Sequence, residues 1–167
     1  FDKLLVKKTL KCANFICPVS EDLNVALKKI FPYKKDKVIR NVVDDSLFNY
    51  SEKSFLNNIK PLIHISSYND EQKNVSGILN TIKKLSTSRS DFKFVFIGDG
   101  NSDFIKEKKR NLCLDDSIVK IFSKMTSIEI ARKLKESYAL VLFSNYENSP
   151  CVISEALMCG TTVVSTN

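Results

Sequence analysis

From Pro61 to Val164 the chain alternates short apolar runs with stretches that have helix signals, and this alternation limits the folds it can adopt. The apolar runs lie at residues 61–66, 92–97, 117–122, 139–144 and 161–164. Strands that alternate with helices of this length form βαβ units, and such units pack into a parallel sheet. We therefore predict an α/β fold built on a parallel sheet.

Four helices are expected between these runs. Thr126-Ser-Ile-Glu129 matches a capping box, which opens a helix. Pro150 stands at a first turn and Gly160 follows a last turn, as at helix ends. The predicted helices span residues 74–85, 103–112, 126–137 and 150–159. Ligands of parallel sheets bind beyond the carboxyl ends of the strands, so the loops at 66–74, 98–100, 122–126 and 144–150 are where a site is expected.

The first 40 residues carry a smaller pattern of the same kind. We predict a strand at 12–20, a helix at 21–30 and a short strand at 37–40. Residues 41–60 are polar and turn-rich, and we interpret them as a linker to a main domain at 61–167. Because the chain starts without Met and stops after a strand, we expect a piece of a longer protein, truncated at both ends.

Composition narrows the function classes. The chain has 167 residues, 43% hydrophobic and 27% charged, and no apolar run approaches the roughly 20 residues of a membrane span. The net charge of +7 favours an anionic ligand or surface, such as a nucleotide diphosphate, a nucleic acid or an acidic membrane. A lysine-rich solvated surface explains the charge equally well. Nucleic acid is disfavoured, because the basic residues are scattered and not interleaved with aromatics.

Cysteine and histidine usage points away from metal and nucleophile chemistry. The five cysteines are odd in number and no pair has CxxC spacing, so we expect reduced, mostly buried thiols in a cytoplasmic protein. His64 is the only histidine and lies inside an apolar run, which favours a structural role. The neighbouring acids Asp44-Asp45 and Asp115-Asp116 do not directly follow a strong strand, so no metal site is expected.

Two glutamates eight positions apart, Glu147 and Glu155, are the main clue to function. Carboxylates accept hydrogen bonds from sugar hydroxyls. The loop between them runs into a helix N-terminus, where free backbone N–H groups and the helix dipole favour a phosphate. This order of groups matches a nucleotide diphosphate sugar. A surface glutamate and a helix-end glutamate at the same spacing are the plain alternative.

The segment around these glutamates resembles the C-terminal donor-binding domain of retaining glycosyltransferases with the GT-B fold, family 4. The family has a strand, Ser, a short loop, Glu, seven residues, Glu-Ala, and Gly ahead of a β-branched strand. Residues 98–100, Gly-Asp-Gly, and residues 38–44, near the expected passage between domains, are also similar to the family. The matching positions here are Ser144, Glu147, Glu155-Ala156, Cys159-Gly160 and Val163-Val164.

The resemblance implies a role for each matching residue. Glu147 would be the catalytic residue, facing the donor sugar near the reacting carbon, and Glu155 would bind the donor ribose. Lys73 matches the family's lysine that neutralises the leaving diphosphate, where a fixed cation stabilises developing negative charge. The alternative for Lys73 is an exposed lysine near a helix start.

The loop between the glutamates would complete the donor site. It comprises Asn148 and Ser149, and the backbone amides of Cys151 and Val152 would meet the pyrophosphate. The family usually has an arginine shortly after the preceding strand, whereas this chain has Ser66-Ser-Tyr-Asn69 with Tyr68 nearest. The pyrophosphate clamp is therefore expected to be weaker or completed elsewhere.

The resemblance implies a Rossmann-like parallel sheet with helices on both faces, one half of a GT-B fold. Residues 1–40 would be the tail of an N-terminal acceptor domain. The expected function is retaining transfer from a UDP- or GDP-sugar to a glycan or lipid-linked acceptor, without a metal or cofactor, in the cytoplasm or in peripheral association with the membrane. Two alternatives are a nucleotide-sugar epimerase of GT-B fold and a non-catalytic basic α/β module that binds an anionic partner.

Overall fold

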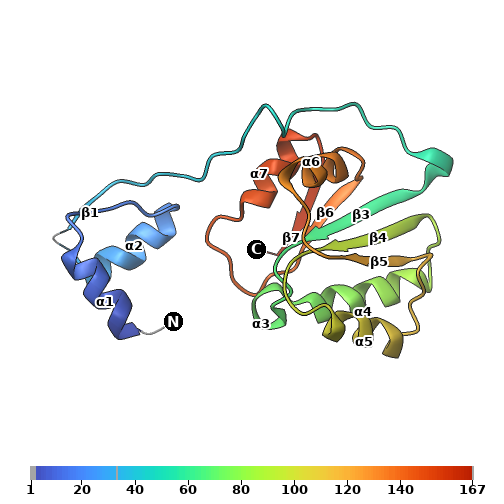
Figure 1. The fold of residues 1–167 in the computed structure, drawn as a ribbon, viewed down its shortest axis with the longest axis horizontal. Helices are drawn as coiled ribbons and strands as arrows, with labels where there is room; N and C mark the ends of the chain where they lie inside the picture. Colours follow the sequence, from blue (N-terminus) through green and yellow to red (C-terminus); the bar gives the residue numbers. More distant parts are fainter. Residues whose placement is uncertain (1–2, 33, 167) are drawn as a thin grey trace. The chain divides into compact units, whose positions relative to one another are not determined.

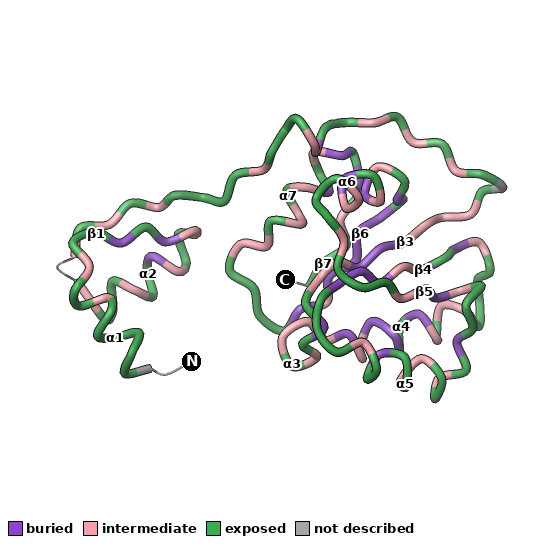
Figure 2. The backbone as a smooth tube through the Cα atoms, in the orientation of Figure 1, coloured by how far each residue is buried: buried purple, intermediate pink, exposed green. Residues whose placement is uncertain are grey.

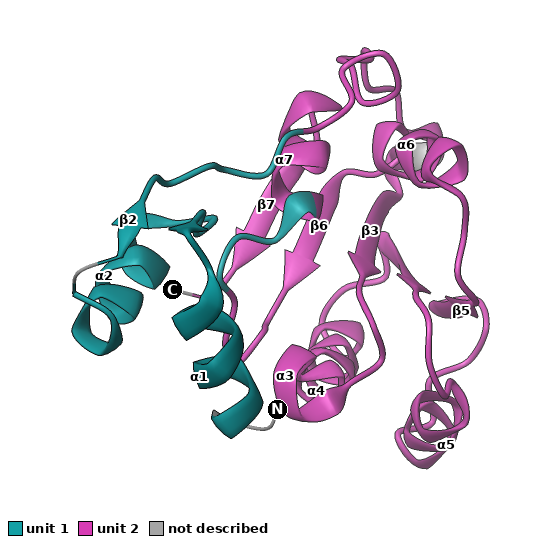
Figure 3. Ribbon diagram, turned by 60° about the vertical axis from the view of Figure 1, so that its left-hand side comes forward, with its two compact units in different colours: residues 1–42, 148–151 teal, residues 43–147, 152–167 magenta. Residues whose placement is uncertain are grey.

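A computed structural model describes residues 3–32 and 34–166, which form two compact units (Figure 3). The first unit comprises the residues up to Val42 together with Asn148–Cys151. The second comprises Val43–Glu147 and the residues from Val152 onward. The assignment of residues 1–40 to an acceptor domain and of 41–60 to a linker stays a prediction.

The first unit is a small βαβ piece preceded by a helix. Strands β1 and β2 pair in parallel, with Phe15 opposite Lys35 and Ile16 opposite Asp36. Ser20 caps helix α2, because its side chain accepts a 3.2 Å hydrogen bond from the backbone N–H of Leu23. The elements are α1 (Lys3–Cys12), β1 (Phe15–Ile16), α2 (Glu21–Ile30) and β2 (Lys35–Asp36).

Two expectations for this unit need correction, and one helix was not expected. The strand expected at 12–20 is only the two residues of β1, and the strand expected at 37–40 lies earlier, in β2. Residues 37–40 still run extended, since Ile39 donates a 2.9 Å hydrogen bond to the carbonyl of Pro18, but they form no ladder. Helix α1 was not predicted, because its apolar side chains, such as 63% exposed Leu5, give no buried stripe to detect.

The second unit is built on a five-stranded parallel sheet of order β5-β4-β3-β6-β7. The predicted α/β class and the parallel sheet are therefore confirmed. The strands begin and end within two residues of the predicted runs, because each run is bounded by polar or turn residues. They are β3 (Lys60–Ile65), β4 (Phe92–Ile97), β5 (Val119–Phe122), β6 (Ala139–Leu142) and β7 (Thr162–Ser165).

Helices cover both faces of this sheet, with α4 and α5 on one side and α6 and α7 on the other (Figure 1). The predicted capping box is present: the N–H of Glu129 donates to the hydroxyl of Thr126, and the Glu129 carboxylate accepts from the Thr126 N–H. No described helix has both the length and the apolar character needed to cross a membrane. The helical elements are η1 (Leu56–Asn58), α3 (Asp70–Lys73), α4 (Val75–Ser86), α5 (Asp103–Asn111), α6 (Ser127–Lys135) and α7 (Cys151–Met158).

Two apolar cores result, one on each face of the sheet, and the buried backbone runs through the strands between them (Figure 2). Phe94 and Phe96 of β4 pack against α4 and α5 in the first core, which confirms that they are packing residues. Ile97 lies in the second core with Leu134 of α6 and Leu140 of β6. Burial on both faces explains why the strands read as continuous apolar runs.

The sheet has a switch point between β3 and β6. From β3 the chain adds β4 and then β5 on one side, and it then crosses to the other side to add β6 and β7. Strand β3 pairs with β4 along six residue pairs, from Lys60↔Phe92 to Ile65↔Ile97. Its pairing with β6 covers only Leu62↔Ala139 and Ile63↔Leu140. The carboxyl ends of β3 and β6 are therefore unpaired with each other, at the place where open α/β sheets bind ligands.

Within the second unit, the ammonium group of Lys53 connects the segment before β3 to the end of α6. Nζ of Lys53 donates to the carbonyls of Leu134, Lys135 and Ser137 at 2.8, 2.9 and 3.1 Å, and to the hydroxyl of Thr161 at 2.8 Å. Carbonyls at a helix C-terminus lack partners within the helix and carry partial negative charge, so a cation is stabilising there. Burial lowers the pKa of Lys53.

We expect Lys53→Met to destabilise the protein by about 2–3 kcal/mol, because it takes the ammonium away from the carbonyls of Lys135 and Ser137, whereas the Leu134 carbonyl keeps the Thr161 hydroxyl as a donor. Urea unfolding followed by circular dichroism measures this change. Lys106→Met is the control, since Lys106 makes only an exposed ion pair within α5, and its effect should stay within about 0.5 kcal/mol. Equal effects of the two substitutions would show that the Lys53 contacts contribute nothing.

Candidate functional site

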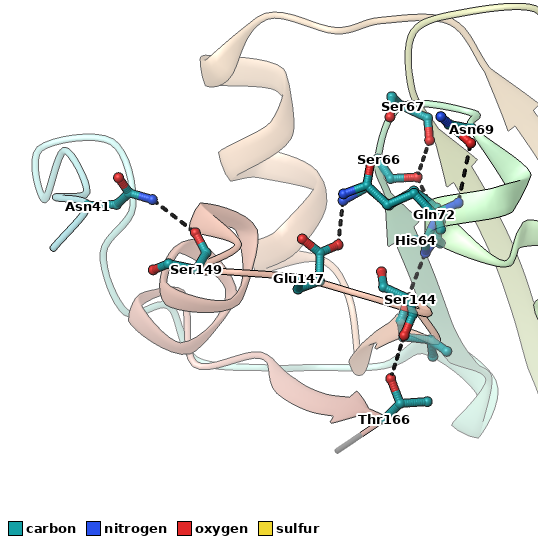
Figure 4. Close-up of polar contacts among 12 residues, drawn as sticks. Asn41, His64, Ser66, Ser67, Asn69, Gln72, Ser144, Glu147, Ser149 and Thr166 are labelled. Atoms are coloured by element: carbon teal, nitrogen blue, oxygen red, sulfur yellow. Dashed lines mark hydrogen bonds and ion pairs between the residues drawn. The ribbon is translucent and has the colours of Figure 1, made fainter. Parts of the chain in front are cut away.

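Loops that follow β3 and β6 meet at the switch point and bring together two predicted site residues (Figure 4). The side chain of Lys73, from α3, forms an ion pair with Glu147, from the loop after β6. The two side chains are 15% and 23% exposed. A pair this far removed from water interacts more strongly than a surface salt bridge, and removal of either partner leaves a half-buried charge.

The turn that carries Lys73 is fixed by a series of capping bonds. Asn69 accepts from the N–H of Gln72 at 3.3 Å, and Asp70 accepts from the N–H of Ser76 at 2.7 Å. Asn74 ends α3 in the left-handed conformation, with φ of 49°, and its side chain then caps α4. Asparagine tolerates this conformation better than most residues. The polar sequence between β3 and α4 therefore folds into one defined turn with Lys73 at its end.

Asn145 joins this turn to the loop that carries Glu147. Its backbone N–H donates to the carbonyl of Gln72, and its side-chain Nδ2 donates to the carbonyl of Glu71, both at 2.8 Å. The two carbonyls belong to the residues directly before Lys73. The lysine turn and the acidic loop are thus held in register by two bonds beside the ion pair.

Glu155 lies in the second turn of α7 and is partly buried. Its carboxylate has no hydrogen-bond or ion-pair partner within residues 3–32 and 34–166, and no such contact joins it to Lys73 or Glu147. Burial raises the pKa of Glu155. A desolvated carboxylate without a partner is costly to the fold, which is typical of a group that binds a ligand.

The remaining predicted site residues lie at the start of α7. Asn148 is exposed, and the carbonyl of Ser149 accepts a 2.9 Å hydrogen bond from Nδ2 of Asn41 within the first unit (Figure 4). Cys151 and Val152 are the first two residues of the helix. No described residue accepts a hydrogen bond from their backbone amides, and the first turn carries no acidic residue. These amides are open to an anion.

Tyr68, at the place of the family's arginine, is a packing residue. It is 8% exposed, and its hydroxyl donates a 2.6 Å hydrogen bond to the carbonyl of Phe122. The Gly98–Gly100 turn lies against it: a Cβ on Gly98 would come within 1.9 Å of the Ser66 carbonyl and 2.8 Å of the Tyr68 ring. Glycine is required there for this close approach. Tyr68 supplies no charge, so Lys73 is the cation of this turn.

Three polar residues at the switch point received no site role from the sequence. His64 is fully buried, with Nδ1 2.8 Å from the carbonyl of Val141 and Nε2 2.7 Å from the hydroxyl of Ser66. Ser144 has a buried hydroxyl without a partner in the described chain, and Asn145 makes the bonds given above. Their positions near the carboxyl ends of strands were the available sequence signal for a site, but polar residues are common there.

The pKa of His64 is lowered from 6.5 to about 4, first because burial disfavours the imidazolium; the ammonium of Lys73 acts in the same direction, while the Val141 carbonyl and Glu147 oppose it. The unfolded chain therefore binds a proton between about pH 6.5 and 4 that the folded chain does not bind. Stability should rise with pH across this window, by at most about 1.4 kcal/mol per pH unit.

We expect the imidazole of this single histidine to stay neutral, with Nδ1 protonated, down to near pH 4. Nitrogen-15 NMR of the ring measures both tautomer and pKa. In parallel, His64→Asn should make the rise in unfolding free energy between pH 4 and 6.5 shallower, because carboxylates with a lowered pKa, such as Asp91 and Glu129, still contribute to it, while the substitution lowers overall stability. An imidazole that titrates near 6.5 would contradict the buried neutral state.

Comparisons with known proteins give the family and the fold. A family model described as "Glycosyl transferases group 1" matches residues 48–167. Among solved structures, HepE from Anabaena, in complex with UDP and glucose, is similar at a TM-score of 0.73 and 20% identity, over 98% of this chain and 47% of that one. A TarM variant from S. aureus, in complex with Fondaparinux, alpha-GlcNAc-glycerol and UDP, is similar at 0.81 and 18%, over 98% and 32%.

Sucrose-phosphate synthase from Thermosynechococcus elongatus is similar at a TM-score of 0.80 and 16% identity, over 97% of this chain and 43% of that one. The chain thus spans less than half the length of these three structures. No curated protein matches it. The shared architecture is one Rossmann-like half of the GT-B fold. Because the family model covers most of the sequence, the chain belongs to the family of glycosyl transferases group 1.

Proposed function

We propose that this chain is the nucleotide-sugar donor-binding part of a retaining glycosyltransferase, which transfers a sugar to a glycan or lipid-linked acceptor in glycan or polysaccharide biosynthesis. The ion pair of Lys73 and Glu147 at the switch point carries this proposal, within a member of the group 1 family. A cation and an anion side by side suit a ligand with a diphosphate at one end and hydroxyls at the other.

Lys73 is the residue proposed to stabilise the leaving group. In the transfer, the bond between the anomeric carbon and the diphosphate oxygen breaks, and its electron pair stays on the phosphate. The acceptor oxygen bonds to that carbon on the same face, and the acceptor proton passes to the leaving phosphate. An ammonium fixed by the turn after β3 stabilises the charge that develops on the diphosphate. Glu147 is the proposed catalytic residue beside the reacting carbon.

The other contacts would hold the nucleotide. The unpaired carboxylate of Glu155 suits the ribose hydroxyls, because ionised carboxylates only accept hydrogen bonds. The open amides of Cys151 and Val152, with Asn148 and Ser149 in the loop before them, suit the pyrophosphate. No cation at Tyr68 assists them, which makes Lys73 the larger contributor to diphosphate binding.

We propose a UDP- or GDP-sugar as the donor and the cytoplasm, beside the membrane, as the place where the enzyme works. HepE and the TarM variant were solved with UDP, which supports UDP as the first nucleotide to test here. The net charge of +7 supports work beside an anionic membrane. Cysteine usage without CxxC spacing supports a cytoplasmic protein, but the expectation of mostly buried thiols is wrong, since Cys12, Cys17, Cys113 and Cys151 are exposed. Residues 1–40 would belong to the acceptor domain, and no metal or cofactor is proposed.

Glu155→Gln should weaken binding of UDP or GDP to the intact protein by about tenfold or more, because an amide replaces a charged acceptor with a weaker one. Isothermal titration calorimetry with UDP, GDP and a random oligonucleotide provides the measurement. Glu136→Gln is the control, since this exposed glutamate of α6 pairs only with Lys133. Saturable nucleotide binding in the wild type that is unchanged in Glu155→Gln would contradict the role of Glu155.

Lys73→Met should reduce affinity for the nucleoside diphosphate by roughly ten- to a hundredfold, since it removes a charge-assisted contact. Glu147→Gln should keep that affinity within about threefold but lower sugar transfer by a thousandfold or more, as expected for a group that acts on the reacting carbon. Lys84→Met, an exposed lysine in the last turn of α4, is the matched control. Equal loss of nucleotide affinity in both site variants would show that Glu147 only positions Lys73.

A further inference from the structure

The imidazole of His64 occupies the gap between the carboxyl ends of β3 and β6. Backbone pairing of these strands stops at Ile63 and Leu140. At the next position Nδ1 of His64 lies 2.8 Å from the carbonyl of Val141. A carbonyl can only accept, so Nδ1 carries the proton and the ring replaces a ladder bond. The contact satisfies a buried carbonyl while it separates the two strand ends.

The direction of the next hydrogen bond follows from this tautomer. The ring is neutral, so Nε2 is an acceptor, and the Ser66 hydroxyl 2.7 Å away must donate to it. The same hydroxyl can instead donate to the carbonyl of Ser67 at 2.8 Å, and its single proton serves one acceptor at a time; the buried Nε2 has no other donor within the described chain. With that proton on the His64 side, the Ser66 oxygen offers only lone pairs to any further partner.

His64 is surrounded so that this state is rigid. The ring is 0% exposed, and its edge contacts Phe96 of β4 with centroids 5.6 Å apart. The charged groups that act on it are Lys73 and Glu147, from the turn after β3 and the loop after β6. Ser66 itself is half-buried, one residue past the end of β3 (Figure 4). A buried group therefore sets the hydrogen-bonding role of a group that solvent and ligands can reach.

Another hydroxyl at the same switch point, that of Ser144, has no hydrogen-bond partner within the described chain. Ser144, two residues past the end of β6, is 8% exposed, and its Oγ has no hydrogen bond within the described chain. Buried hydroxyls are normally satisfied, so such an atom indicates a place where a ligand group completes the bonding. Hydroxyl groups that can still bond a ligand therefore lie past the carboxyl ends of both β3 and β6.

We propose that His64 is a positioning residue that holds Ser66 as a hydrogen-bond acceptor for a hydroxyl of the donor sugar. An oxygen that can only accept disfavours phosphate, which is ionised and has no proton to donate, and favours a hydroxyl. This inference rests on the proposed function, since it names the part of the nucleotide sugar that Ser66 recognises. It adds a contact from β3 to a site otherwise built from α3, the β6 loop and α7.

The test compares UDP with UDP-glucose, and GDP with GDP-mannose, by calorimetry on the intact protein. Ser66→Ala should weaken binding of the nucleotide sugar by about tenfold and leave binding of the free diphosphate within about twofold. Ser88→Ala is the matched control, since this exposed hydroxyl bonds to Leu85 at the far end of α4. It should change neither affinity.

His64→Asn keeps a donor for the Val141 carbonyl but removes the acceptor for Ser66. It should shift the ratio of the two affinities in the same direction as Ser66→Ala, and the double variant should equal Ser66→Ala alone, because His64 acts through Ser66. Ser66→Thr, which retains the hydroxyl, should restore the ratio. A loss of thermal stability without this pattern is what a purely structural histidine would give.

The outcomes separate this inference from the proposed function. If the wild type binds neither diphosphate nor nucleotide sugar, the proposed function fails. If it binds both and Ser66→Ala leaves their ratio unchanged, or weakens both equally, the sugar contact is wrong while the donor site stands.

Discussion

The site depends on the short backbone pairing between β3 and β6. These two strands lie side by side although their paired residues, such as Leu62 and Ala139, are 77 positions apart in the sequence, because βαβ units extend the sheet first on one side and then on the other. Their carboxyl ends diverge after two residue pairs. Beyond that point the loops run close enough for side chains to bridge them, as Lys73 and Glu147 do and as Asn145 does to the lysine turn.

Positioning in this site is achieved with backbone bonds as much as with side-chain charges. The lysine turn is capped at both ends, and Asn145 attaches it to the acidic loop through two carbonyls. Close packing of Gly98 against Tyr68 fixes the loop after β4 beside it. Lys73 and Glu147 therefore lose little conformational entropy when a ligand binds, since their backbones are already ordered.

The sequence was sufficient for the sheet and for naming Lys73 and Glu147 as site candidates, and insufficient for the ion pair between them and for what surrounds it. Buried strands such as Phe92–Ile97 and the capping box at Thr126 carry strong local signals. The family resemblance located both charged residues. His64 was interpreted as structural because an apolar neighbourhood hides its hydrogen bonds. Helix α1 was not predicted, and the two strands of the first unit were predicted with wrong bounds, since two-residue strands leave no periodicity.

The mutual neutralisation of Lys73 and Glu147 has a consequence for selectivity. The Lys73 ammonium has three N–H donors, so a ligand anion can share it with the Glu147 carboxylate, which then repels that anion unless the ligand also brings hydrogen-bond donors. A molecule with an anionic end but no hydroxyls, such as inorganic pyrophosphate, gains the ammonium but keeps this repulsion. The ion pair thus favours ligands that carry both kinds of group at the right separation, and it disfavours the abundant simple anions of the cell.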